Sequence, residues 1–473
     1  MPKYNPVTPD DIEQFERICG KENVLSGTDS RLARYARDQV SEERYAHKPE
    51  VAVKPSTPEE IASILKLAYT RLIPVTPRGA GSGLSGGAVP LHGGISLSLE
   101  RMNRIIEIDP ANLMAVVEPG VVTNKLDEAL ERTGLFFAGY PLSEEICYVG
   151  GNVAENAGGG RAIKYGVTGE YVKGLEVVTP NGDVIRMGGK RVKDVTGYNL
   201  IGLMVGSEGT LGIFTKITLK LLPRPAVRMS LLALFREVKD AIDCLPAIMT
   251  GEGIVPTSAE LMDRRCLHEA CRDLQETLPY EEAGAALLLE ADGPDERTVR
   301  SQLQTMNRIC AATGAIEILE AESAEDIERF WRLRKQIPWT LKRRSPHQSV
   351  EDIVVPIAAI PQIVECIDAI AAKYEISIPV FGHAGDGNLH ATPQMNPDQS
   401  IEHWEAILPE ILAELYRETA RLGGTISGEH GIGHKRKKYM PLAMGQEQIE
   451  MMRSIKRALD PRGILNPGKI FEM

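Results

Sequence analysis

The sequence has few aromatic residues and no cluster of cysteines, and these absences exclude several classes of protein. Its seven cysteines are dispersed and never form a C-x-x-C pair, which excludes a usual iron–sulfur ligand run and favours reduced thiols. No stretch approaches the roughly 18 apolar residues of a transmembrane helix. Fifty-four basic residues against 65 acidic ones give a net charge of −11, which argues against a dominant nucleic-acid or anionic-lipid surface.

What remains is an ordinary soluble composition, with 43% hydrophobic and 25% charged residues. A length of 473 residues allows two to four domains. Residues 1–11 contain two acids and three prolines but no apolar segment, so a secretory signal is not expected. We expect a cytoplasmic protein; a peripheral position at a membrane, reached through a partner, stays open.

Glycine is abundant, and its placement is more informative than its total of 44. Seven glycines fall within 79–94 and eight within 150–174. Scattered glycines indicate turns, whereas clustered glycines indicate backbone that approaches something closely.

The pattern of apolar residues predicts alternating helices and strands up to about residue 224. A helix is expected over 10–19. A second should begin after Thr57, with Pro58 at its first position and Glu60 completing a capping box. A strand is expected over 72–75. Alternation over 95–108, 175–185 and 213–221 predicts further strands, with Asn181-Gly182 as a hairpin turn.

Two prolines, Pro223 and Pro225, suggest a domain boundary. The segments that follow are predicted in the order βαββαβ, typical of a ferredoxin-like α+β unit: strands over 230–235, 257–262, 285–290 and 315–319, and helices over 237–249 and 296–312. Further helices are expected over 324–342, 360–374, 402–422 and 446–459.

The first glycine cluster matches a dinucleotide-binding fingerprint in its residues but not in the secondary structure expected after it. Residues 81–86 read GSGLSG and match the G-x-G-x-x-G fingerprint of nicotinamide dinucleotide sites. That fingerprint requires a helix to begin at once, because the helix N-terminus holds the pyrophosphate. Here Pro90 and strand-like alternation follow instead. A glycine loop can still bind an anion through its backbone N–H groups, although a flexible surface loop would look the same.

The second cluster favours a ligand. Residues 150–160 read GGNVAENAGGG, in which small residues and amides dominate. This composition suits hydrogen bonding to a flat ring system pressed against backbone. Segments 193–199 and 206–213 add two more backbone-rich stretches.

With residues 77–86, 150–159 and 205–213, the chain resembles the FAD-binding domain of the vanillyl-alcohol-oxidase, or PCMH-type, flavoproteins. With the histidine motifs described below, it resembles the branch of glycolate oxidase flavin subunits, D-lactate dehydrogenases and other D-2-hydroxyacid dehydrogenases. The implied fold class is α+β: an N-terminal helical segment (1–46), a PCMH-type FAD-binding domain of two α+β subdomains (47–224), a ferredoxin-like cap domain for the substrate (225–425) and a C-terminal segment returning to the flavin (426–473).

The resemblance implies a set of FAD-binding residues: Arg78, Gly79, Ala80, Gly81, Ser82, Gly83, Leu84, Ser85, Pro141, Leu142, Ser143, Gly150, Gly151, Asn152, Ala154, Asn156, Gly158, Gly159, Glu208, Ile213 and Asn466. Some relatives attach the flavin to a histidine in the first loop. Ser82 occupies that position here, which implies non-covalent FAD.

Histidine is concentrated near the C-terminus. Residues 381–390 read FGHAGDGNLH, and 427–433 read SGEHGIG. Two imidazoles and a carboxylate on glycine-rich backbone could form a divalent metal site with open positions, and zinc, iron and manganese are all compatible. A lone buried histidine would more often be a core residue. By resemblance, His383, His390 and Glu429 are the metal ligands and His430 is the active-site base.

Arg334 and Asn388 match positions that hold a substrate carboxylate, although Arg332, Lys335 and Arg343 lie near the former and a basic run is commonly a solvated helix face. The hydroxyglutarate enzymes carry a lysine for a distal carboxylate, and residues 350–352 offer none. A shorter acid of the D-lactate or glycolate class is therefore favoured.

The implied activity is oxidation of a D-2-hydroxy acid to the 2-oxo acid. A metal would lower the pKa of the hydroxyl, His430 would accept its proton, and hydride would pass to flavin N5. The implied electron acceptor is an iron–sulfur subunit or an electron-transfer flavoprotein, and homo-oligomer formation stays open. Two alternatives remain: a non-catalytic FAD subunit that relays electrons, and a metal hydrolase whose glycine loops bind phosphate.

Overall fold

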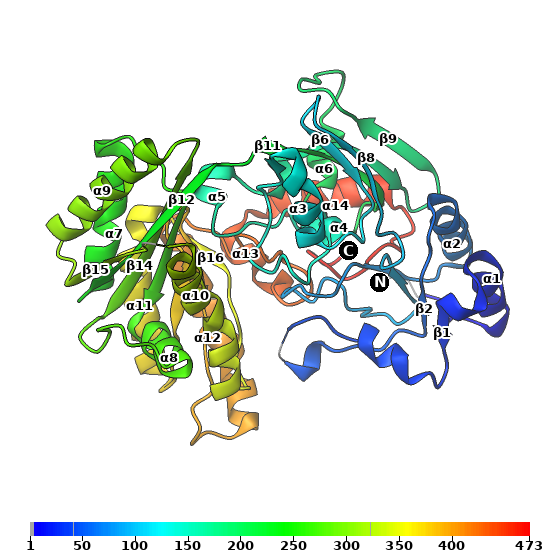
Figure 1. Cartoon of the computed structure of the whole chain (residues 1–473). Coiled ribbons are helices and arrows are strands. Elements are labelled where there is room, and N and C mark those ends of the chain that lie inside the picture. The colour runs from blue at the N-terminus through cyan, green and yellow to red at the C-terminus, as the bar shows by residue number, and fades with distance from the viewer. Residues whose placement is uncertain (1–3, 41, 322) are drawn as a thin grey trace. The chain divides into compact units, whose positions relative to one another are not determined.

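A computed structural model describes residues 4–40, 42–321 and 323–473. The chain divides into two compact units (Figure 1). The first unit comprises residues up to 158, 167–224 and 429–473, and the second comprises 159–166 and 225–428. The chain therefore enters the second unit twice, once briefly and once for some 200 residues.

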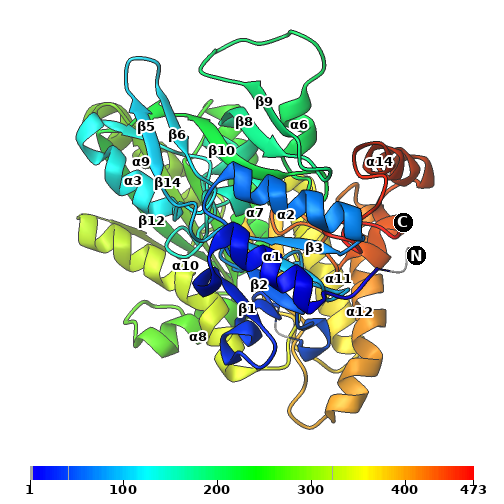
Figure 2. The same ribbon diagram turned by 90° about the vertical axis from the view of Figure 1, so that its right-hand side faces the viewer.

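The first unit contains a four-stranded sheet in the order β1 (Val24–Ser26), β2 (Val51–Val53), β4 (Ile95–Ser98) and β3 (Val75–Arg78). Helix α2 (Pro58–Arg71) forms the crossover between the parallel strands β2 and β3. Its apolar face is buried, with Ile61, Ile64 and Leu65 inaccessible to solvent in the core. Helix α1 (Pro9–Cys19) packs beside α2 (Figure 2). The predictions of both helices are confirmed.

The start of α2 differs in one detail from the prediction. Thr57 accepts a hydrogen bond from the Glu60 backbone as expected, but the Glu60 carboxylate accepts from the Ser56 N–H at 2.6 Å rather than closing a capping box. At the other end, Leu72 adopts a left-handed conformation with φ 57°. The strand predicted over 72–75 therefore begins only at Val75, because this cap must first turn the chain.

A five-stranded sheet in the same unit has the order β5 (Ile105–Asp109), β6 (Met114–Val117), β10 (Ile213–Lys220), β8 (Val172–Val178) and β9 (Val184–Gly188). Strands β8 and β9 form the predicted antiparallel hairpin, and Gly182 supplies a positive φ of 84° in its turn. The remaining elements of the unit are α3 (Thr123–Leu130), β7 (Leu135–Phe136), α4 (Val149–Glu155), α6 (Leu200–Met204), β11 (Leu222–Pro223), α13 (Met440–Ala443) and α14 (Gln446–Leu459).

The C-terminal stretch completes the first unit. Leu465 forms a parallel bridge with Val75 of β3, and both Ile464 and Leu465 are fully buried in the core beneath α2. Lys456 of α14 is also buried and donates to the Thr210 and Leu465 carbonyls. Residues some 250 to 390 apart in sequence thus share one core.

The second unit is built on a seven-stranded sheet in the order β15 (Glu317–Glu320), β12 (Val227–Phe235), β14 (Ala285–Gly293), β13 (Ser258–Asp263), β17 (Val380–His383), β18 (Asn388–Ala391) and β16 (Ile353–Val354). Taken in chain order, its first four strands pair as 4-1-3-2, the ferredoxin-like arrangement. Helices α7 (Val238–Pro246) and α9 (Glu296–Ala312) pack against β12 and β14. The α+β fold class and the ferredoxin-like unit are confirmed.

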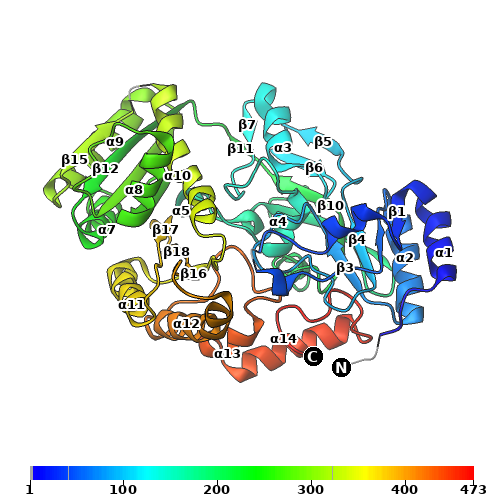
Figure 3. The same ribbon diagram turned by 90° about the horizontal axis from the view of Figure 1, so that it is seen from below.

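The sequence did not predict the helix that follows β13, nor the short helix over 162–165. Helix α8 (Arg264–Leu274) follows β13 directly and is capped by the Asp263 carboxylate. The sequence pattern showed no sign that a strand ends and a helix begins at this point. The other helices are the short α5 (Ala162–Tyr165), α10 (Ala324–Arg344), α11 (Ile360–Lys373) and α12 (Ile401–Arg421), of which α11 and α12 lie side by side (Figure 3).

Candidate active site: two glycine loops and a polar sheet face

The first glycine loop joins β3 to β4. No helix begins between Arg78 and Ile95, a stretch that the structure describes throughout, so the argument against a nicotinamide fingerprint is confirmed. The loop backbone is partly accessible over 79–84, and then becomes buried from Ser85. Exposed N–H groups of such a loop can bind a diphosphate without a helix.

The side chain of Arg78 supports the backbone of this loop. Its guanidinium is buried and donates to the Arg34 and Arg37 carbonyls at 3.1 and 2.9 Å. Gly81 has φ +72°, and a Cβ added there would lie 2.0 Å from Arg78 Nη2. The arginine therefore supports the loop conformation, and only glycine fits above it.

The second glycine cluster forms α4 and the turn after it. Gly79 and Gly151 approach closely: a Cβ on Gly79 would lie 3.8 Å from the Gly151 Cα, while a Cβ on Gly151 would meet nothing within 4 Å. This open backbone beside the first loop suits a flat ligand lying against both. Asn152 is buried and donates to Thr123 Oγ1 at 2.8 Å, whereas Asn156 has φ 56° and accepts from the Gly169 N–H.

The other residues predicted to bind FAD lie around these loops or in the neighbouring sheet. Gly150 donates to the Pro119 carbonyl, and Ser143 accepts two backbone hydrogen bonds in the turn before α4. Ile213 is a buried residue at the start of β10. Gly159 differs from the rest because it belongs to the second unit.

Glu208 connects the third backbone-rich segment with the C-terminal stretch. Its carboxylate is buried and accepts from the Ile432 and Gly433 N–H groups at 2.8 and 2.6 Å. Asn466 donates to the Glu208 carbonyl at 2.7 Å and to the Gly87 carbonyl at 3.1 Å. These hydrogen bonds fix the turn that directly follows His430 against the glycine loops.

Glu155, at the end of α4, is a half-buried residue next to this network, and its Oε2 is inaccessible to solvent. Burial and the neighbouring Glu208 carboxylate raise its pKa well above the ordinary range. Burial also raises the pKa of Glu208, although the two backbone donors act in the opposite direction.

In the second unit, one face of the sheet carries a row of polar side chains. Residues paired across antiparallel strands point to the same side, as do residues i and i+2 of one strand. The pairings Ser230 with Glu290, Glu290 with Ser258, Glu260 with His383, and His383 with Asn388 therefore place all of these on one face, together with His390. Five neighbouring strands, β12, β14, β13, β17 and β18, contribute to this face.

Glu260 lies at the centre of this row and was not among the predicted site residues. Its carboxylate is fully buried: Oε1 lies 2.7 Å from His383 Nδ1, and Oε2 accepts from Arg334 Nε at 2.7 Å. Burial acts to raise its pKa, but the interactions with His383 and Arg334 outweigh burial and the pKa is lowered. Glu260 is therefore a carboxylate that accepts both hydrogen bonds.

Arg334 of α10 is buried, unlike the exposed Arg332. The interpretation of this basic run as a solvated helix face therefore fails for Arg334. Its guanidinium lies over the Phe381 ring, 4.8 Å from the centroid, and Nη2 finds no hydrogen-bond partner among the described residues. A buried guanidinium with an unused donor is suited to binding an anion.

Asn388 is positioned by Asp352, a second residue that the sequence did not single out. Asn388 Nδ2 donates to Asp352 Oδ1 at 2.8 Å, and Asp352 Oδ2 accepts from Ser427 Oγ and the Gly428 N–H. Asp352 thereby holds the segment that continues into Glu429 and His430.

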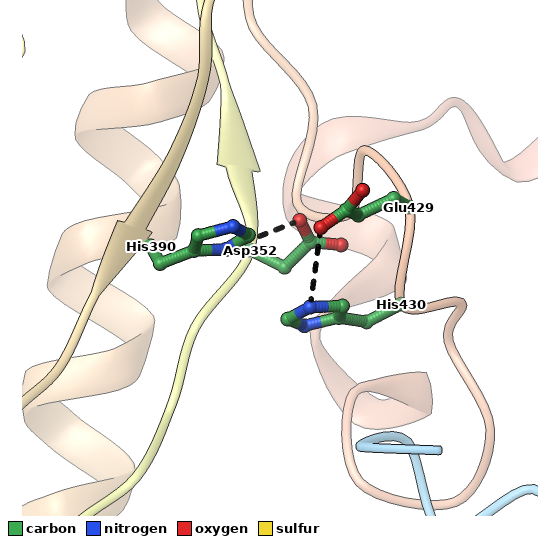
Figure 4. A group of neighbouring side chains, drawn as sticks. All are labelled: Asp352, His390, Glu429 and His430. Carbon is green, nitrogen blue, oxygen red and sulfur yellow. Dashed lines mark ion pairs between the residues drawn. The ribbon is translucent and has the colours of Figure 1, made fainter. Parts of the chain in front are cut away.

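Four possible metal ligands gather where this segment begins (Figure 4): Asp352, His390, Glu429 and His430. One donor atom of each lies within 4.8 Å of the others. His383 is outside this group of four, but its ring centroid lies 5.4 Å from that of His390. Imidazoles and carboxylates are the donor set of zinc, iron and manganese sites, so these residues fit a divalent metal.

Glu260 and Asp352 were missed because both are acids in strand-like surroundings without a glycine motif. The usable signal was chemical: Glu260 lies in a stretch, 257–262, whose neighbours are apolar or small. A charged residue in a buried strand must have a partner.

The glycine loops on a sheet without a Rossmann helix, followed by a ferredoxin-like unit, define an FAD-dependent oxidoreductase of the PCMH type. A family model described as "FAD binding domain" matches residues 49–188, and one described as "FAD linked oxidases, C-terminal domain" matches residues 224–470. The chain belongs to the FAD-linked oxidases.

Two curated relatives match over nearly their whole length. The glycolate oxidase subunit GlcD of Bacillus subtilis is 41% identical over 98% of this chain and 97% of its own. A D-lactate dehydrogenase of Anaerostipes hadrus is 36% identical, with 99% and 98% covered. The branch of the family expected from the sequence motifs is thus confirmed.

Solved structures show the same fold at lower identity. p-Cresol methylhydroxylase with bound substrate has a TM-score of 0.81 at 21% identity, over 99% of both chains. A 4-ethylphenol oxidase from Gulosibacter chungangensis has a TM-score of 0.79 at 21% identity, over 100% of this chain and 99% of its own. Within the described ranges, no helix combines the length and apolar character needed to cross a membrane.

Proposed function

We propose that this protein is an FAD- and metal-dependent dehydrogenase that oxidises a small D-2-hydroxy acid, of the D-lactate or glycolate class, to the 2-oxo acid. The observation that carries the proposal is the polar sheet face, where buried Arg334 and Glu260 accompany His383, Asn388 and His390. Relatives named as a glycolate oxidase subunit and a D-lactate dehydrogenase support it.

We assign a role to each residue of the site from its chemistry. Arg334 and Asn388 bind the substrate carboxylate; Arg334 Nη2 is a buried donor with no hydrogen-bond partner in the part of the chain that the structure describes. His383, His390 and Glu429 hold the metal. Asp352 already accepts three hydrogen bonds, so we assign it to positioning Asn388 and the segment before Glu429 rather than to the metal.

His430 is the general base. An imidazole is the side chain most often used as a general base near neutrality, and it could accept the hydroxyl proton. When bound, a divalent metal would stabilise a developing alkoxide and non-covalent FAD would accept the hydride. The turn after His430 is held by Glu208, so the base has a fixed backbone.

A short substrate fits the residues near the site. Glu351 and Asp352 are buried carboxylates, and residues 350–352 contribute no cation for a distal carboxylate. We assign the electrons to a separate acceptor, an iron–sulfur subunit or an electron-transfer flavoprotein, in keeping with the description of one relative as a subunit. The protein would then work in the cytoplasm, or at a membrane through that partner.

Anaerobic bleaching of the flavin absorbance tests the proposal. D-lactate or glycolate should bleach the flavin of the purified protein, whereas L-lactate and D-2-hydroxyglutarate should bleach it far more slowly. His430→Ala should retain the flavin spectrum, but its rate of flavin bleaching should fall by at least about 100-fold, because general-base catalysis contributes about that much to the rate.

Two outcomes would contradict it. A colourless protein with hydrolase activity would favour a metal hydrolase. Unchanged flavin reduction in His430→Ala would favour an FAD subunit that only relays electrons.

A further inference from the structure

We propose that Glu260 is a positioning residue that fixes the tautomer of His383 and the orientation of Arg334 with a single buried carboxylate. This inference rests on the proposed function, since it assigns a role beside the metal and the substrate carboxylate. It concerns a residue whose side chain would touch neither.

The Glu260 carboxylate is an acceptor shared by His383 and Arg334. Strands β13 and β17 are antiparallel neighbours, and Glu260 is paired directly with His383. Their side chains therefore leave the sheet on the same side, and Oε1 lies 2.7 Å from His383 Nδ1. Arg334 approaches from α10 and gives Nε to Oε2, also at 2.7 Å.

The hydrogen-bond roles follow from chemistry. An arginine Nε is always a donor, and an ionised carboxylate can only accept. His383 Nδ1 must therefore carry a proton, which in the neutral imidazole leaves the lone pair on Nε2. This is the tautomer that binds a metal, and metal-binding histidines usually donate their other N–H to a carboxylate or carbonyl in this way.

The surroundings of Glu260 leave it little freedom. Its side chain is fully buried, and Ser258 Oγ also lies 3.2 Å from Oε1. A Cβ added to Gly160, two residues before α5, would lie 2.8 Å from Oε1, so the backbone at Gly160 lies close to this carboxylate. Rotation of the carboxylate away from both partners is therefore sterically restricted.

The test variant is Glu260→Gln, which keeps the shape of the side chain but replaces one of the two acceptor oxygens with an NH2 donor. The amide oxygen can accept from only one partner. If the NH2 group faced Arg334 Nε, two hydrogen-bond donors would point at each other. The NH2 group should therefore face His383 Nδ1 and favour the tautomer protonated at Nε2, which cannot bind a metal. We expect metal affinity to fall roughly 10- to 100-fold.

The experiment measures Zn²⁺ and Mn²⁺ binding to the full-length flavoprotein. The matched control is Glu290→Gln: Glu290 is also fully buried on the same sheet face and accepts from Trp331 and Arg228, but among the described residues it has no hydrogen bond to a predicted metal ligand. Wild type and Glu290→Gln should bind the metal alike, and all three proteins should keep the same flavin absorbance. Thermal midpoints, measured alongside, should not separate Glu260→Gln from Glu290→Gln.

Two further measurements keep the test decisive. In a His383→Ala background, Glu260→Gln should cause no additional loss of metal affinity, because its effect passes through His383. Wild-type affinity in Glu260→Gln would overturn the inference. If the wild type itself binds no metal, the proposed function fails in its metal part. The ¹⁵N shifts of His383 then decide the role of Glu260: a proton on Nδ1 supports it, and a proton on Nε2 overturns it.

Discussion

At the scale of single residues, the site depends on acids that hold other residues rather than on the acids visible in motifs. Glu260 orients His383 and Arg334, and Asp352 orients Asn388. Each is buried, where an unpaired carboxylate would cost several kcal/mol. Their partners therefore determine whether they can remain charged.

Arg334→Lys tests the role of the buried guanidinium. Lysine keeps the charge but loses both the bond to Glu260 and the planar donor group, so KM for the hydroxy acid should rise roughly 10- to 100-fold, as expected for a lost charged hydrogen bond. Steady-state kinetics with D-lactate and glycolate measure this. Arg332→Lys, on the exposed face of the same helix, should leave KM unchanged. Equal effects of the two substitutions would remove Arg334 from the substrate site.

At the scale of elements, the glycine loops are shaped by what lies beneath them. The first loop follows a strand and leads to no helix, so its conformation depends on Arg78 and on the C-terminal turn held by Glu208. The ferredoxin-like strands, by contrast, could be predicted from short local runs of apolar residues. The conformation of the first loop thus depends on residues remote in sequence that a local pattern does not reveal.

Gly81→Ala should disrupt the first loop. Its positive φ and the 2.0 Å approach to Arg78 Nη2 mean that a methyl group must displace the arginine. We expect lower thermal stability and loss of FAD on gel filtration, at a cost of at least about 1 kcal/mol from the backbone conformation alone. Gly83→Ala is the control, because an added Cβ there would meet only Asp38 Oδ2, at 4.0 Å. Similar melting temperatures for both variants would show that the loop can rearrange around an alanine.

At the scale of the whole molecule, the first unit is assembled from three stretches of chain, and their contacts bury several charges together. Asp38, Glu155 and Glu208 come from different parts of the sequence, and Arg436 and Lys469 come from the last stretch. Burial raises the pKa values of all three acids and lowers that of Lys469 to about 7. Global stability is therefore expected to depend on pH through these groups.

Glu155→Gln tests that dependence. The folded-state pKa of Glu155 lies above the ordinary value of 4.5, so the folded protein retains a proton that the unfolded chain loses as pH rises. This group's contribution to stability is largest below pH 4.5 and declines as pH rises toward the folded-state pKa. Thermal unfolding should give Glu155→Gln a higher midpoint than wild type at pH 8 and a shrinking difference toward pH 4.5. A difference independent of pH would contradict the raised pKa.

The sequence by itself determined the helices and strands with clear periodicity, the two glycine loops, the ferredoxin-like order and the histidine motifs, because each depends on residues close together in the chain. The resemblance of its motifs to those of known flavoproteins also indicated the FAD-linked family. Only the tertiary structure showed that Arg334 is buried, that Glu260 faces His383, and that Glu208 fixes the turn after His430. Arg334 and Glu260 are 74 residues apart in sequence, Glu260 and His383 are 123 apart, and Glu208 and the turn after His430 are more than 220 apart. Packing of distant strands, helices and loops brings such side chains together, and a local sequence pattern carries no information about it.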